Sequence, residues 1–275
     1  MISVLILTKD EELNLPRCLE ASRWCDDIVV LDSGSSDRTV AIAEAAGARV
    51  FHRPWDNEAG QRRFSLGLPF KYPWVYNPDA DEIADNILIE EMRKVAAEPN
   101  AKIVAYRVRF KNIFLGKWVR HSSLYPTWIV RLFRPEKIRF EREINLRYCI
   151  DGDEGRLQGH LLHYSFNKGL HAWFEKHNYY STKEAEEALK ILRGQSVRWR
   201  DFFSGSPIVQ RKALKEFSFK LPFRSSLRFL YSYFFRLGIL DGRAGLTYCR
   251  LLAQYEYMIT LKVRELRLRE KGLPI

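Results

Sequence analysis

Short hydrophobic runs alternate with helical patterns along the first part of the chain. Apolar runs at Ile2–Leu7, Asp27–Leu31 and Ala48–His52 are typical of buried strands. The spacing of apolar residues predicts helices between them, at Leu13–Trp24 and Thr39–Ala46. Strands that alternate with helices in this way indicate an α/β fold whose central sheet is mostly parallel.

The same pattern leads to a group of acidic residues. A helix is predicted over Asn57–Leu66, and the apolar run Trp74–Tyr76 predicts another buried strand. Shortly after this run, Asp79, Asp81 and Glu82 place three carboxylates within four positions. The strand therefore presents these acids at its carboxyl end.

Three of the predicted strands end in polar loops, Thr8–Glu12, Asp32–Asp37 and Asp79–Glu82. Because the carboxyl ends of parallel strands meet at one edge of a sheet, we expect these loops to converge where open α/β sheets bind ligands. Asp79 and Asp81 are two positions apart and share one face of an extended chain. Their oxygens suit a Mg²⁺ or Mn²⁺ ion that carries a diphosphate. The alternative is a solvated acidic turn that caps the next helix.

The pattern after the acids predicts a second series of elements. We expect an amphipathic helix, two strands and a long helix, at Ile83–Ala97, Lys102–Phe110, Trp128–Phe133 and from Lys176 through Leu189. His160 and His163 lie three positions apart, in the part of the sequence between the second of these strands and the long helix. In a strand these two side chains face opposite ways, so they do not readily share one metal ion.

Positive charge is concentrated in the last third of the 275 residues. The net charge is +11, and residues 190–275 hold 18 Lys and Arg against 6 Asp and Glu. Aromatic residues interleave with these cations, and helices are predicted at Arg224–Leu237 and Leu246–Arg269, with a turn at Asp241–Gly245. We therefore predict a domain at 1–189 and a basic helical extension at 190–275. The extension suits an anionic membrane surface. The alternatives are a helical cap with solvated cations and RNA binding, for which no motif is present.

Other features exclude several classes of protein. Four cysteines occur without a Cys-x-x-Cys pair, so neither a disulfide framework nor a zinc site is indicated, and a reducing cytosol fits. The first residues lack the features of a signal peptide, and no apolar run is long enough for a transmembrane helix. The glycine patterns of dinucleotide-binding Rossmann domains and of P-loops are also absent from the sequence.

Three segments carry a resemblance to a known family: Leu7–Leu15, Val30–Thr39 and Asp79–Glu82. In this order and at these spacings they resemble the signatures of family 2 glycosyltransferases. Within that family, the chain is most similar to the bacterial lipopolysaccharide core and exopolysaccharide transferases. The resemblance covers residues 1 to about 180 and implies a GT-A fold, a nucleotide-diphosphate sugar donor and inversion at the anomeric carbon.

The resemblance also implies roles for the residues at the sheet edge. Thr8 and Glu11 would line the nucleoside pocket, and Asp32 would bond the base, which is uracil in many members of the family. Asp79 would touch the ribose or the metal. Asp81 would hold the metal on the diphosphate. We therefore expect a divalent cation as cofactor and a UDP-sugar as the preferred donor.

Basic side chains are expected near the diphosphate, because its negative charge grows as it leaves. Arg62 and Arg63 precede the acidic loop and are candidates, although they also fit a solvated helix face. The resemblance suggests that His163 approaches the metal and the diphosphate, and the alternative is a structural histidine. Lys176 lies in a segment that resembles this branch and is a candidate for steering the diphosphate.

The general base is the point at which the sequence departs from the family. Inversion by one displacement needs a group that takes the proton of the acceptor hydroxyl. The family pattern places a glutamate where this chain has Leu146. Glu143 is our candidate instead, and its alternative is a surface charge. If no base exists, the chain would be a non-catalytic sugar-nucleotide- or membrane-binding protein on the same scaffold.

The preferred hypothesis is an inverting, metal-assisted glycosyltransferase that acts on a lipid-linked or lipopolysaccharide-type acceptor. The segregated charge of the extension predicts that it works peripherally at the inner face of the bacterial membrane. Nucleic acid is not expected as a partner.

Overall fold

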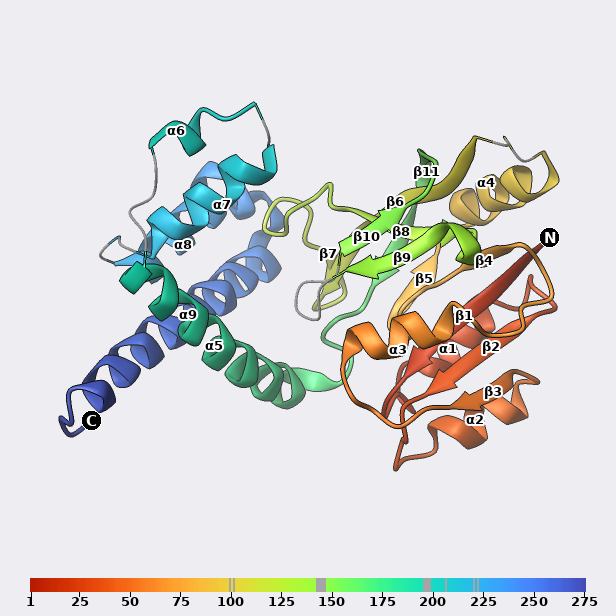
Figure 1. Ribbon diagram of the computed structural model, residues 1–275, viewed down its shortest axis with the longest axis horizontal. Helices are drawn as coiled ribbons and strands as arrows, with labels where there is room; N and C mark the ends of the chain where they lie inside the picture. The colour runs from red at the N-terminus through yellow and green to blue at the C-terminus, as the bar shows by residue number, and fades with distance from the viewer. Residues whose placement is uncertain are drawn as a thin grey trace. The chain divides into compact units, whose positions relative to one another are not determined.

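The computed structural model describes residues 1–98, 100, 102–141, 147–194, 199–205, 207–219, 221 and 223–275. Contacts gather the chain into two compact units. The first consists of Met1–Trp118 and Leu124–Lys168, and the second of Val119–Ser123 and Gly169–Ile275. Figure 1 shows the helices and strands of both units. The predicted boundary between residues 189 and 190 stays a prediction, because compact contacts do not show where an independently folding domain begins.

One sheet organises the first unit. Four parallel strands lie in the order β3 (Arg49–His52), β2 (Ile28–Asp32), β1 (Ile2–Thr8) and β4 (Trp74–Tyr76). The sheet continues through β8 (Trp128–Phe133), β6 (Ile103–Phe114), β11 (Asp153–His163) and β5 (Glu82–Ala84). β8 and β5 run antiparallel to their neighbours, and β7 (Lys117–Trp118) pairs with β6. The predicted α/β fold with a mostly parallel sheet flanked by helices is confirmed.

Both faces of this sheet are covered, which explains why its central strands are apolar throughout. On β1, Val4 and Ile6 pack into one cluster with α1 (Leu15–Ala21), α2 (Thr39–Ala45) and α4 (Asn86–Ala97). Leu5 points to the opposite face and packs with the segment that follows α3 (Glu58–Ser65). The β-hairpin of β9 (Ile138–Glu141) and β10 (Arg147–Ile150) and the 3₁₀ turn η1 (Pro135–Lys137) complete the elements of this unit.

The helix predicted from Ile83 begins later than expected. Residues Glu82–Ala84 instead form β5, whose backbone pairs with β11. Asp85 then caps α4, because its side chain accepts the N–H of Leu88 at 2.9 Å. The local pattern was misleading here, because the pairing partner lies about eighty residues further along the chain.

The second unit is helical. It contains α5 (Gly169–Gly194), α6 (Trp199–Phe202), α7 (Pro207–Ser218), α8 (Arg224–Leu230), the π turn η2 (Tyr231–Phe235), the 3₁₀ turn η3 (Gly238–Asp241) and α9 (Gly242–Glu270). Helices α5 and α9 pack together through Ala185, Ala188, Ile259 and Val263. The predicted helical extension is thus confirmed, but α9 begins at Gly242, within the predicted turn. In the described parts of the chain, no helix is long and apolar enough to cross a membrane.

Candidate functional site

The three polar loops converge at one edge of the sheet, as predicted. Thr8 lies opposite Asp32 in the parallel register of β1 and β2. Asp79 forms an isolated parallel bridge with Leu7. Residues from three separate loops are therefore neighbours at the carboxyl ends of adjacent strands.

Asp32 organises the loop that follows β2. One carboxylate oxygen accepts the Thr8 hydroxyl at 3.1 Å and the Ser35 hydroxyl at 2.5 Å. The other accepts the N–H groups of Gly34 and Ser35, both at 2.9 Å. Burial raises the pKa of Asp32, but these hydrogen bonds outweigh it and hold the pKa below its ordinary value. Asp32 is therefore a charged residue, almost fully buried, that fixes the loop.

We predict that Asp32→Asn lowers the free energy of unfolding by about 2 kcal/mol at pH 7, because an amide cannot accept all these hydrogen bonds. The lowered pKa means that Asp32 stabilises the fold above its unfolded value of about 3.9. This contribution is lost as the pH falls through the folded value, so the difference between the proteins should shrink in acid. Urea titrations at several pH values measure it. Asp26→Asn, at an exposed carboxylate, is the control, and an equal effect there would contradict the prediction.

The loop after β1 is tied to the same structure. The Asp10 carboxylate accepts the N–H of Ser36 at 2.7 Å. Glu11 receives hydrogen bonds from Lys168 at 2.7 Å and from Asn14 at 2.8 Å. Burial raises the pKa of Glu11 although these partners oppose the shift. Thr8, Glu11 and Asp32 thus lie together at this edge of the sheet. Contact of Thr8 or Glu11 with a nucleoside stays a prediction.

Asp79, whose side chain is 41% exposed, belongs to a network with the buried residues Glu82, Arg62 and Arg131. Its oxygens accept Arg62 at 3.2 Å and Arg131 at 2.5 Å. Arg131, from β8, also donates two hydrogen bonds of 2.8 Å to Glu82, whose side chain is 2% exposed. Burial alone would raise the pKa of Asp79, but Arg131 and Arg62 hold it well below its usual range. Asp79 is therefore ionised, and Arg62 is buried instead of belonging to a solvated helix face.

Sequence reasoning did not single out Arg131 or Glu82 for a role in this network. The available signal was an arginine in the middle of the apolar run Trp128–Phe133, since an arginine buried in a strand needs an acidic partner. The sequence could not say which of the many acids it would meet.

The remaining predicted basic residues and the predicted base lie elsewhere. Arg63 is exposed and donates to the Phe140 carbonyl oxygen at 3.3 Å. Lys176 is exposed on α5 in the second unit, with its ammonium group 5.9 Å from the Tyr180 ring centre. Glu143 and Leu146 lie outside the described residues. The roles predicted for these residues stay predictions.

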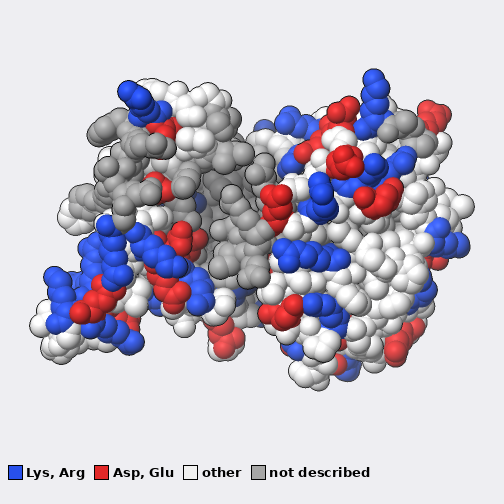
Figure 2. Space-filling view, in the orientation of Figure 1, with Lys and Arg blue, Asp and Glu red and all other residues white. Residues whose placement is uncertain are grey.

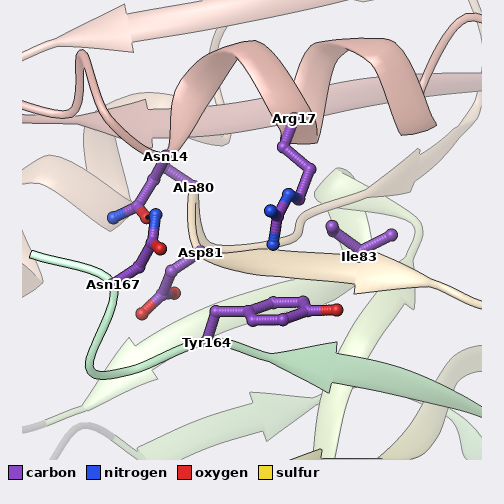
Figure 3. Close-up of a pocket in the computed structure, with 7 residues that line it drawn as sticks. All are labelled: Asn14, Arg17, Ala80, Asp81, Ile83, Tyr164 and Asn167. Carbon is purple, nitrogen blue, oxygen red and sulfur yellow. Dashed lines mark hydrogen bonds between the residues drawn. The ribbon is translucent and has the colours of Figure 1, made fainter. Parts of the chain in front are cut away.

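Asp81 and His163 form a pair that suits a divalent cation. Their Oδ2 and Nε2 atoms are 3.4 Å apart. Nδ1 of His163 lies 2.8 Å from the Asn112 amide oxygen, which can only accept, so in the neutral ring Nε2 carries the lone pair. A second hydrogen bond that orients an imidazole in this way is typical of metal-binding histidines. In Figure 3 the Asp81 carboxylate lies near Asn167 and points away from Arg17.

His160 faces the other way, as predicted. Its ring nitrogens lie 3.0 Å from the Tyr125 hydroxyl and 3.4 Å from the Asp85 carboxylate. Among the described residues, no three His, Cys, Asp or Glu side chains converge as a complete metal site. A cation at Asp81 and His163 would therefore need ligands from a bound molecule or from water.

Two cavities border these residues. An open cleft of about 420 Å³ is lined by Glu58, Arg62, Asp79, Ile129, Val130, Arg131 and Tyr148. The pocket of Figure 3 is far smaller, about 10 Å³, and is lined by Asn14, Arg17, Ala80, Asp81, Ile83, Tyr164 and Asn167. The smaller pocket has room for about one water molecule. The larger cleft has the size of a small-molecule site.

Comparisons with known proteins agree with this fold, and they define the chain as a glycosyltransferase. The model of glycosyl transferase family 2 matches residues 3–158. Because this is more than half of the chain, the protein belongs to that family.

Individual relatives extend the comparison. The chain is 30% identical to the lipopolysaccharide core biosynthesis glycosyltransferase LpsC of Rhizobium meliloti, over 75% of this chain and 78% of LpsC. It is 25% identical to the uncharacterized glycosyltransferase RT0209 of Rickettsia typhi, over 99% and 89% of the two chains. The fold resembles the mannosyltransferase PcManGT of Pyrobaculum calidifontis, with a TM-score of 0.50 and 12% identity over 95% and 86% of the chains.

Proposed function

We propose that this protein transfers a sugar from a nucleotide-diphosphate donor to a lipid-linked, lipopolysaccharide-type or exopolysaccharide-type acceptor, with inversion at the anomeric carbon. The observation that carries the proposal is the Asp81–His163 pair beside the network of Asp79 and Arg131. A lone acidic turn would need neither an oriented imidazole nor buried arginines.

In this proposal the donor lies along the sheet edge. Thr8, Glu11 and Asp32 contact the nucleoside, with UDP as the preferred nucleotide. The diphosphate and the sugar enter the open cleft beside Asp79, whose lining includes Arg62. Arg62 pairs with Glu58 and Asp79, and Arg131 pairs with Asp79 and Glu82, so three carboxylates face two arginines here. A diphosphate would therefore enter this cleft together with a cation that offsets its negative charge.

A divalent cation would bind between Asp81 and His163, and the diphosphate and water would complete its coordination. When bound, such an ion neutralises the negative charge that develops on the leaving diphosphate. PcManGT was solved with GDP-Man and Mn²⁺, so this fold accommodates a sugar nucleotide with a metal. The imidazole ligand favours a transition-metal ion such as Mn²⁺ over Mg²⁺.

In the proposed chemistry, the acceptor hydroxyl oxygen attacks the anomeric carbon as the bond to the diphosphate oxygen breaks. A general base takes the hydroxyl proton, and the nucleoside diphosphate leaves. Glu143 is the candidate base. Lys176 stays the candidate that the sequence gives for steering the diphosphate.

The acceptor class and the location rest on two observations. LpsC is named for lipopolysaccharide core biosynthesis. The extension at 190–275 concentrates positive charge and aromatic residues. Both observations support an enzyme that binds peripherally to the inner face of the cytoplasmic membrane. Lipid-linked acceptors and anionic headgroups are found together there.

A second candidate function is a sugar-nucleotide-binding protein without transferase activity. Leu146, which stands where the family pattern has glutamate, favours it. Nucleotide binding without turnover, over a set of donors and acceptors that includes lipid-linked glycans, would support this candidate over the transferase.

Calorimetric titration of UDP, GDP and ADP, each without metal, with Mg²⁺ and with Mn²⁺, tests the donor site. We expect one nucleotide to bind at least about tenfold more tightly with Mn²⁺ than without metal, and we expect this nucleotide to be UDP. Mg²⁺ should give a smaller gain. If no nucleotide binds under any condition, the proposed donor site is wrong.

A further inference from the structure

An exposed apolar stripe runs along the second unit between residues 223 and 240. Leu227, Leu230, Tyr231 and Phe234 recur at the spacing of one helix face, and each is 44–50% exposed. The stripe, defined by the exposed large apolar residues of this segment, consists of Phe223, Leu227, Leu230, Tyr231, Phe234, Phe235, Leu237, Ile239 and Leu240. Soluble proteins rarely expose continuous apolar patches of more than a few hundred Å², so a partner is expected to cover it.

The polar side of this segment is the side that faces its own unit. α8 packs on α9, where Arg224 pairs with Glu256 at 2.7 Å. The Ser225 hydroxyl donates to the Ala253 carbonyl oxygen at 2.8 Å, and Ser232 is buried. Surface helices of globular proteins normally do the reverse. The exposed apolar side chains are therefore not the side by which this segment packs on its own unit.

The turn that carries the end of the stripe is closely packed. The Asp241 carboxylate accepts both the N–H of Ser122 at 2.7 Å and its hydroxyl at 2.6 Å. A Cβ atom added at Gly238 would lie 2.7 Å from the Ser232 carbonyl oxygen, so a larger residue does not fit. A fixed backbone thus holds the exposed side chains outward, which reduces the entropy that a partner must overcome.

The charge of the segment indicates what kind of partner fits. Residues 223–240 contain no acidic residue. Their three arginines are partly buried, and Arg224 is already paired with Glu256, but the exposed Arg243 follows the segment. Further cations gather along the C-terminal half of α9, with acidic side chains among them (Figure 2). Two copies of the stripe would bring like charges together, which disfavours self-association. Aromatic and aliphatic side chains bordered by cations instead match the headgroup region of an anionic bilayer.

We propose that the stripe is the element by which this protein docks on an anionic lipid surface. Its apolar side chains enter the boundary between headgroups and acyl chains, and the exposed Arg243 beside the stripe meets lipid phosphate. The segment lies in the plane of the interface. This inference rests on the proposed function, because it names the part of the chain that would bring the enzyme to a lipid-linked acceptor.

The test is flotation of the full-length protein with vesicles of phosphatidylcholine alone or with added phosphatidylglycerol. Wild type should bind the anionic vesicles, and less at high salt. The double variant Phe235→Asp/Leu240→Asp, at side chains 81% and 65% exposed, should lower the partition coefficient at least about tenfold. The matched control is Ile87→Asp/Leu115→Asp in the first unit, where exposure is 63% and 66% and the charge change is equal. The control should bind like wild type.

Several outcomes would overturn the proposal. These are wild type that ignores anionic vesicles, a stripe variant that binds them like wild type, and a control that loses as much binding. A dimer that the stripe variant dissociates would assign the stripe to self-association, and a large drop in melting temperature would assign it to packing within the chain. Nucleotide titration of the same variants keeps the two proposals separate: loss of docking with unchanged nucleotide binding leaves the donor site intact.

Discussion

Replacing Arg131 with methionine should destabilise the protein by about 3–5 kcal/mol, because it leaves the buried Glu82 without its cation. Arg131 donates two hydrogen bonds to Glu82 and one to Asp79, and its side chain is only 7% exposed. Methionine fills a similar volume, so the loss of stability measures the effect of the missing charge and not that of a cavity. Urea denaturation of the purified variant measures the change.

Two further variants separate charge from packing at this site. Arg107→Met removes the arginine of an ion pair with Glu154, whose two side chains are each about a third exposed, and should cost less than about 1 kcal/mol. Adding Glu82→Gln to Arg131→Met removes the unpaired charge and should restore part of the lost stability. If the double variant is no more stable than Arg131→Met alone, an uncompensated carboxylate is not the cause.

Replacing Asp81 should remove metal-dependent turnover, with kcat lowered at least about a thousandfold in Asp81→Ala. The proposed cation has two protein ligands, Asp81 and His163, so loss of one leaves a single neutral donor. Asp81→Asn keeps the shape of the side chain and tests the charge. Calorimetric titration gives a second readout that does not depend on turnover. In Asp81→Ala, the gain that Mn²⁺ gives to nucleotide binding should disappear.

The control for Asp81 is Asp85→Asn, four residues further along the chain. Asp85 caps α4 and lies 3.4 Å from His160, on the other side of β11 from His163. This variant should lose some stability but keep the Mn²⁺-dependent gain in nucleotide binding. Full activity of Asp81→Ala, or equal loss of the Mn²⁺ effect in Asp85→Asn, would contradict the metal assignment.

The predicted convergence of the three loops was confirmed because it depends on few assumptions. Apolar runs such as Ile2–Leu7 predict strands, and parallel strands place their carboxyl ends together. Thr8, Asp32 and Asp79 therefore had to become neighbours once the strand order was right. The family membership, which the three segments predicted, was confirmed by the match over residues 3–158.

The partners of these acids were much harder to predict. Arg131 reaches Asp79 across 52 positions, and Lys168 reaches Glu11 across 157. A charged residue has many possible partners in a sequence, and only the pairing of strands selects one. The strand β5 was missed for the same reason, because its hydrogen bonds are made to β11 and not to its own neighbours.

The sequence by itself determined the α/β class, the acidic sheet edge, the family and the segregation of positive charge, since each follows from local periodicity, motif order or composition. Only the tertiary structure decided that Arg131 pairs with Asp79 and Glu82, that His163 turns toward Asp81, and that the stripe from Phe223 to Leu240 faces outward. An amphipathic pattern states that a helix has two faces, but its packing partners decide which face is buried. Charges likewise acquire specific partners only when the folded chain removes water from between them.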